Sequence, residues 1–105
     1  MVPHMVPFSS GIVFLMGRFE NLEKLHAKFK ISQSNINFSD LCRLAEMVGF
    51  SFDRQNGSHK VYRHAKYPGI MNFQDVRGKG KPYQVKQLLN FIDEHDLLKK
   101  DDGNV

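Results

Sequence analysis

The stretch "FSFDRQNGSHKVYRH", Phe50 to His64, decides the fold of this chain. Phe50 and Phe52 alternate with polar residues, which is typical of a half-buried β-strand. The dipeptide Asn56-Gly57 follows, and it favours the two-residue turn of a β-hairpin because both of its residues tolerate a positive φ. The return strand is predicted over Ser58–Ala65. An antiparallel hairpin is therefore expected at the centre of the chain.

The register of this hairpin decides where its histidine lies. If Asn56-Gly57 forms the turn, Arg54 pairs with His59 and Phe52 pairs with Val61. Cross-strand partners share a face of the sheet, so His59 is predicted on the core face, at its rim beside Arg54. The opposite face would then carry Lys60, Tyr62 and His64. A slip of one residue would reverse this assignment.

Further elements are predicted on both sides of the hairpin. A helix is expected over Glu20–Lys30, and a second one is expected to start at the N-cap Ser39 and to end at Gly49. After a turn at Pro68-Gly69, a third strand is predicted over Ile70–Val76. The segment "RGKGKP" reads as a flexible basic loop. Pro82 suits the first turn of a last helix, whose apolar stripe consists of Val85, Leu88, Leu89 and Ile92.

These elements predict an α+β domain in the order α-α-β-β-β-α, with a three-stranded antiparallel sheet covered on one face by helices. The domain is expected to span residues 20–98. Residues 1–19 are expected to form a flexible arm, and residues 99–105 a charged tail. The apolar run "GIVFLM" in the arm is too short for a membrane span and has no Lys or Arg before it. The pattern leaves open whether the natural start is Met1 or Met16.

Composition limits the class of protein. The chain has 105 residues, of which 41% are hydrophobic and 25% charged, so we expect one small globular domain. A single cysteine excludes an internal disulfide and a cysteine-based zinc site, which is typical of the reducing cytoplasm. The five histidines show no metal-ligand spacing. Neither a metal nor another cofactor is therefore expected, and no membrane association.

The positive charge is concentrated in one window, residues 54–86. This window holds eight basic residues against the single acid Asp75, a balance of +7, whereas the whole chain carries +4. Such a patch attracts polyanions, of which nucleic acid is the usual one. The residues expected to contact RNA are Arg54, Ser58, Lys60, Arg63, Lys79, Lys81 and Lys86.

Several motifs, in this order, resemble a known family. They are Gly49-Phe50 after a helix, the triplet Gly57-Ser58-His59 at the hairpin, and the closing "KPYQVKQLL" over Lys81–Leu89. Together they resemble the HicA toxins of bacterial type II toxin–antitoxin modules, over about Phe38–Leu98. The resemblance implies a fold related to double-stranded-RNA-binding domains and an mRNA-cleaving activity that arrests growth. It also implies that His59 is the catalytic residue and that a HicB-like antitoxin protein masks the site.

The chain departs from the family pattern in two places. Many members have a second histidine directly after the first, where this chain has Lys60. Many also carry Pro-x-His in the third strand, where this chain reads "NFQDVRGKGKP". A site with one histidine is therefore expected, and its second proton-transfer group is not identified by the sequence.

A mechanism follows from the charge pattern together with the resemblance. His59 would remove the proton of a ribose 2′-hydroxyl, while Arg54, Lys60 or Lys79 would offset the charge that builds on phosphorus. Two alternatives stay open. One is a non-catalytic RNA-binding module that uses residues 54–86. The other is a protein-interaction domain whose basic window docks an acidic partner.

Overall fold

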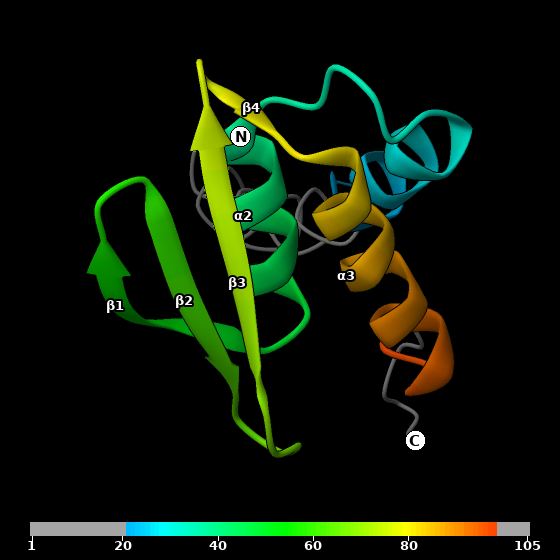
Figure 1. Cartoon of the computed structure of the whole chain (residues 1–105). Coiled ribbons are helices and arrows are strands. Elements are labelled where there is room, and N and C mark those ends of the chain that lie inside the picture. Colours follow the sequence, from blue (N-terminus) through cyan, green and yellow to red (C-terminus); the bar gives the residue numbers. More distant parts are fainter. Residues whose placement is uncertain (1–20, 99–105) are drawn as a thin grey trace, which may run out of the picture.

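The computed structural model describes residues 21–98, which form helices packed against one face of an antiparallel sheet (Figure 1). This is the α+β arrangement that the sequence predicts. The predicted arm, residues 1–19, and the predicted tail, residues 99–105, both lie outside the described residues.

The elements follow one another with short connections. Residues 21–31 are helical, as predicted from the spacing of Leu22, Leu25 and Phe29. After this first helix come α2 (Phe38–Met47), β1 (Phe50–Asn56), β2 (His59–His64), β3 (Ile70–Val76), β4 (Lys79–Gly80) and α3 (Pro82–Glu94). The strands are ordered β1-β2-β3-β4 in the sheet, and every neighbouring pair is antiparallel.

The sheet has four strands rather than the predicted three. The segment expected to be a flexible loop instead turns tightly at Arg77-Gly78, where φ is 55° and 82°, and returns as β4. Backbone bonds from the segment before α2 secure this strand. Phe38 N donates to Gly78 O over 2.8 Å, and Gly80 N donates to Ile36 O over 2.8 Å. These bonds pair backbone polar groups of Gly78 and Gly80 with residues 36–38. The sequence pattern did not reveal this pairing.

The helices bury the predicted apolar stripes. All four stripe residues of α3 are buried, and so are Leu41, Leu44 and Ala45 of α2. In Figure 1, α2 lies behind the strands and α3 lies beside it. The first helix adds Leu25 and Phe29, and the sheet adds Phe50, Tyr62, Met71 and Phe73. One continuous core therefore lies between the sheet and all three helices.

The start of α2 differs from the prediction. The helix begins at Phe38 with Asn37 as its N-cap, two residues earlier than an N-cap at Ser39 would place it. The side chain of Asn37 does not cap the helix, because its Oδ1 accepts a hydrogen bond of 2.9 Å from Lys79 Nζ. The end of α2 is as predicted. Gly49 follows the C-cap with a φ of 110°, a region that glycine adopts at low cost.

The predicted hairpin register is wrong. The turn contains Gly57 and Ser58, so that Asn56 pairs with His59 and Arg54 pairs with Val61. Phe52 pairs with Tyr62, and the shift between these two pairs marks a β-bulge at Asp53. The side chains that face the helices are consequently Lys60, Tyr62 and His64, the reverse of the prediction.

Burial of Tyr62 explains this register. Its side chain is 2% exposed, its ring centroid lies 5.6 Å from that of Phe73, and its hydroxyl donates to Glu46 Oε2 over 3.3 Å. The predicted register would have turned this ring to solvent. The gain from burying a large aromatic side chain, about 1.5–3 kcal/mol, outweighs the turn preference of Asn-Gly.

Candidate nucleic-acid interface

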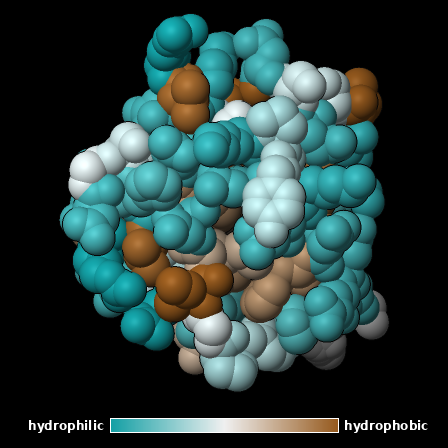
Figure 2. Space-filling view, in the orientation of Figure 1, coloured by the Kyte–Doolittle hydropathy of each residue, from teal (hydrophilic) through white to brown (hydrophobic). Residues whose placement is uncertain are grey.

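The face of the sheet that the helices leave open carries three rows of side chains. Cross-strand pairing on β1, β2 and β3 defines them. The row nearest the β1–β2 turn is Asn56, His59 and Gln74; the next is Arg54, Val61 and Asn72; the third is Ser51, Arg63 and Ile70. We call this surface the open face. In the orientation of Figure 2 the visible surface over the strands is mostly hydrophilic.

His59 lies in a hollow of about 420 Å³ on the open face. Its side chain is half-buried, and no residue of the described chain hydrogen-bonds to its imidazole. Both ring nitrogens are therefore available to a ligand. The floor of the hollow is Val61, which is 5% exposed. The other lining residues are Arg54, Asn56, Ile70 and Asn72.

Asp53, the bulge residue, holds two arginines beside this hollow. Arg54 Nη1 donates to Asp53 Oδ2, and Arg63 Nε lies 3.2 Å from the same oxygen. Both arginine side chains stay more than half exposed. The carboxylate therefore orients two guanidinium groups on the open face without removing them from solvent.

The predicted RNA-contacting residues do not form one patch. Arg54 and Arg63 share the open face with His59, and Arg54 lines the same hollow, although it is paired with Val61 and not with His59 as predicted. Lys60 faces the helices, where its Nζ lies 5.8 Å from the ring centroid of Phe38. Ser58 and Lys60 line a second hollow at the β1–β2 turn together with Arg77.

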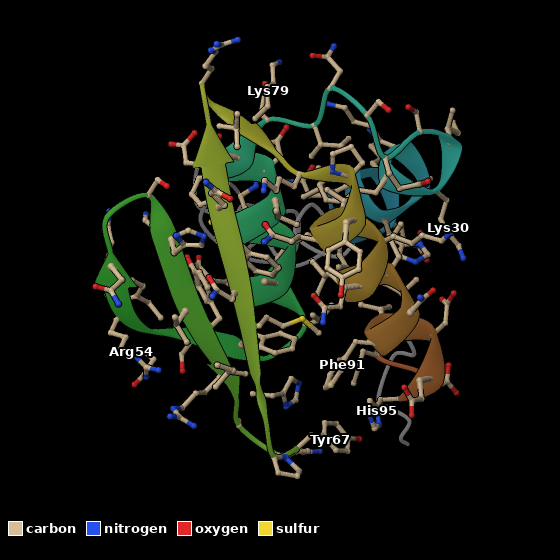
Figure 3. The ribbon with its side chains drawn as sticks, in the orientation of Figure 1. Lys30, Arg54, Tyr67, Lys79, Phe91 and His95 are labelled. Carbon is tan, nitrogen blue, oxygen red and sulfur yellow. The ribbon has the colours of Figure 1, made fainter. Side chains whose placement is uncertain are left out.

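The remaining lysines lie further away. Lys79 belongs to β4, whereas Lys81 and Lys86 lie at the start of α3. Figure 3 shows Lys79 and Arg54 at separate ends of the sheet. The basic window of the sequence is thus divided between the open face and the end of the molecule formed by β4 and α3.

His64, at the other end of β2, is a structural residue. Its Nε2 lies 2.7 Å from Val48 O, and its Nδ1 accepts a 3.0 Å bond from the backbone N–H of Lys66. A carbonyl only accepts and an amide only donates, so these bonds fix the neutral tautomer with the proton on Nε2. The expectation that His64 points to the polar side is wrong, because its ring packs edge-on against Phe50 with centroids 4.9 Å apart.

Aromatic rings surround His64 and fasten the β2–β3 loop to α3. Tyr67 stacks on His95 with ring centroids 3.9 Å apart, and Phe91 lies 5.7 Å from Tyr67. Figure 3 shows these three residues together between the lower parts of β3 and α3. This cluster lies at the end of β2 opposite to His59, so we assign it a role in the stability of the fold and not in the chemistry of the hollow.

The remaining described histidine, His26, lies between the first helix and α3. Its Nε2 has no hydrogen-bond partner and lies 3.8 Å from Asp93 Oδ1. Burial lowers the pKa of this imidazole, and Asp93 opposes that effect in part. Within residues 21–98, no group of three or more His, Cys, Asp or Glu side chains is placed to hold a metal ion.

The sequence did not identify Asp53 or Asn72, and it indicated Asn56 only as a turn residue and not as part of the site. Asn72 was detectable in principle, because it alternates with the buried Met71 and Phe73 and therefore faces the open side of β3. Asp53 was not, because a bulge has no reliable signature in a single sequence.

A family model described as HicA toxin of bacterial toxin–antitoxin matches residues 38–93, more than half of the chain. The chain belongs to the HicA toxin family. The matched range in this HicA toxin contains α2, the whole sheet with the His59 hollow, and nearly all of α3. The first helix lies outside it. Comparisons with curated proteins and with solved structures gave no match.

Membership of the family makes this protein one half of a toxin–antitoxin pairing. None of the helices that the structure describes has the length and apolarity needed to cross a bilayer.

Proposed function

We propose that this HicA toxin is a metal-independent endoribonuclease that cleaves mRNA with His59 as its catalytic residue and thereby arrests growth. One observation carries the proposal. The His59 imidazole, with both nitrogens free of intramolecular bonds, lies in an accessible hollow beside the Arg54 guanidinium. Family membership and the basic window support the same conclusion.

The chemistry needs few groups. His59 accepts the proton of a ribose 2′-hydroxyl, and the 2′-oxygen forms a bond to the adjacent phosphorus as the bond to the 5′-oxygen breaks. The 5′-oxygen takes a proton from water or from the imidazolium. The products are a 2′,3′-cyclic phosphate and a 5′-hydroxyl. Arg54 is the cation best placed to offset the charge on the phosphoryl oxygens, because Lys60 faces the helices.

A HicB-like antitoxin is the proposed partner. An inhibitor of this site has to cover the His59 hollow, and the two exposed arginines on the open face favour an acidic partner surface. Covering this face would exclude RNA without any change in the toxin fold.

The decisive experiment compares the parent protein with His59→Ala on a defined RNA in EDTA. Loss of a general base is expected to slow cleavage by about 10²–10⁴-fold. His95→Ala is the matched control, since His95 stacks on Tyr67 away from the open face. The ends should be cyclic phosphate and 5′-hydroxyl, and a 2′-deoxy substitution at the cleaved position should block the reaction. Cleavage by His59→Ala at the parental rate would overturn the assignment.

Expression in cells tests the biological part of the proposal. The parent protein should arrest growth, and His59→Ala should not, at equal protein levels. Co-expression of a HicB-like protein should restore growth. Arrest by both chains would show that the toxicity does not depend on this imidazole.

One observation favours a second function, an RNA-binding module without chemistry. Among the side chains that line the hollow there is no second imidazole and no carboxylate to serve as a partner of His59 in proton transfer. A module of this kind would bind RNA with strong salt dependence and leave it intact after long incubation.

A further inference from the structure

The amide side chains of the sheet fall into two groups. Gln55 Nε2 donates to Gly57 O over 3.0 Å, and Gln74 Nε2 lies 3.5 Å from Ser58 Oγ. These two amides are engaged in holding the β1–β2 turn. Asn56 and Asn72, by contrast, form no side-chain hydrogen bond within the described chain. Both of these free amides line the His59 hollow.

The row that contains Asn72 presents a cation, an apolar side chain and an amide in succession, and these match the phosphate, the face of the base and the edge of the base in a nucleotide. Arg54 lies at one end of the row on β1, Val61 lies in the middle on β2, and Asn72 lies at the other end on β3. The ends are two strands apart, about 10 Å at the usual spacing of about 4.8 Å between neighbouring strands. This is the scale of one nucleotide from its phosphate to the edge of its base. His59 lies in the adjacent row, on the same strand as Val61.

The apolar part of the hollow continues beside Asn72. Val61 forms the floor, and Ile70, on the same face of β3, is 44% exposed. An aliphatic surface next to a free carboxamide can support the flat face of a base while the amide bonds to its edge. A carboxamide presents both a donor and an acceptor, so it distinguishes bases by the order of these groups.

We propose that Asn72 is the base-reading residue of this toxin, and that it recognises the base of the nucleotide next to the scissile phosphate. Arg54 contacts the phosphate, Val61 and Ile70 support the base, and the Asn72 carboxamide bonds to its edge. The inference rests on the proposed function for its substrate. It adds a source of sequence preference that neither the basic window nor the catalytic histidine supplies.

Binding tests the inference without any need for cleavage. The probes are four short oligoribonucleotides that differ only in the base at one position, and the protein is full-length His59→Ala with and without Asn72→Ala. A carboxamide that reads a base contributes about 5- to 150-fold of discrimination. We expect His59→Ala to prefer one or two of the four bases, and Asn72→Ala to reduce that preference to within twofold. Asn90→Ala is the matched control, because Asn90 is an exposed amide of α3 that lines a different pocket.

Cleavage maps of the catalytically intact chain complete the test. Asn72→Ala should cut the same RNA at more varied sites, and Asn72→Asp, which keeps the size but loses the donor, should change the preferred base. If the parent cleaves and all three chains share one site preference, the nuclease assignment stands and base reading by Asn72 is wrong. If base preference in binding depends on Asn72 but no chain cleaves, base reading stands and the nuclease assignment is wrong. A base preference unaffected by Asn72→Ala in both assays overturns the inference.

Discussion

His59 and His64, at the two ends of β2, lie on opposite faces of the sheet. His59 lines a hollow on the open face, whereas both ring nitrogens of His64 are bonded to the backbone on the helical side. One strand therefore separates a residue available for chemistry from a residue required for folding.

This relationship predicts opposite effects of the same substitution on stability. His64→Ala removes two hydrogen bonds and a packed ring, so it should lower the free energy of unfolding by about 2–4 kcal/mol. His59→Ala removes no internal bond and should change it by less than about 0.5 kcal/mol. Urea denaturation followed by circular dichroism measures both. Equal losses in the two variants would contradict the division of roles.

Gly49 and Gly69 allow strain and steric conflict to be separated. Both have a positive φ, 110° and 101°. A Cβ added at Gly49 would lie 2.6 Å from His64 Nε2, whereas a Cβ added at Gly69 would have no heavy atom of the described structure within 4 Å, apart from its chain neighbours. Gly69→Ala should therefore cost about 1 kcal/mol from backbone strain alone, and Gly49→Ala should cost clearly more. Thermal unfolding of the two variants gives the comparison. A smaller loss for Gly49→Ala would show that the His64 ring moves aside freely.

The charge of Asp53 should limit the affinity of the open face for RNA. Asp53→Asn removes a carboxylate that contacts Arg54 and Arg63, so it should strengthen RNA binding several-fold and make its dependence on salt steeper by about one unit of slope. Asp40→Asn is the matched control, because Asp40 pairs with Lys28 rather than with the arginines of the open face. Binding titrations at several salt concentrations test this. Weaker binding by Asp53→Asn would mean that orientation of the guanidinium groups matters more than the added charge.

His26 should make the fold sensitive to acid. Burial lowers the pKa of this imidazole in the folded state, so the unfolded chain binds the proton more tightly. The contribution of His26 to stability is therefore present above its ordinary pKa of about 6.5 and is lost as the pH falls through the lower folded value. Denaturation curves between pH 7.5 and about pH 5, near the range of ordinary imidazole titration, should show this loss in the parent and less of it in His26→Gln. An equal loss of stability on acidification in the parent and in His26→Gln would contradict this role of His26.

Sequence alone was sufficient for the elements whose signals are local. The stripe from Val85 to Ile92 repeats at helical spacing, and each of its four residues is buried. The third strand was predicted with the bounds that the structure gives, Ile70–Val76. Alternation and helical periodicity report burial directly, so these predictions needed no knowledge of the rest of the chain.

The features that the sequence did not reveal depend on contacts between distant residues. Asn56-Gly57 favours one hairpin register, but the burial of Tyr62 against Phe73 selects another. The two-residue strand β4 exists because residues 36–38 supply its hydrogen bonds. The prediction for His59 was wrong in its cross-strand partner, which is Asn56 instead of Arg54, and in its face of the sheet. Long-range contacts decide which face the helices cover, and a local pattern does not report them.

The first helix has a consequence for how this toxin is handled. Phe29 has no exposed surface, and Lys30 Nζ lies 2.7 Å from Asp93 Oδ2 in α3, yet the match to the family model starts only at residue 38. A chain that starts at residue 38 would lack the first helix, so the core would lose Leu25 and Phe29. A chain that is to fold by itself should accordingly include the first helix, which precedes the residues matched by the family model.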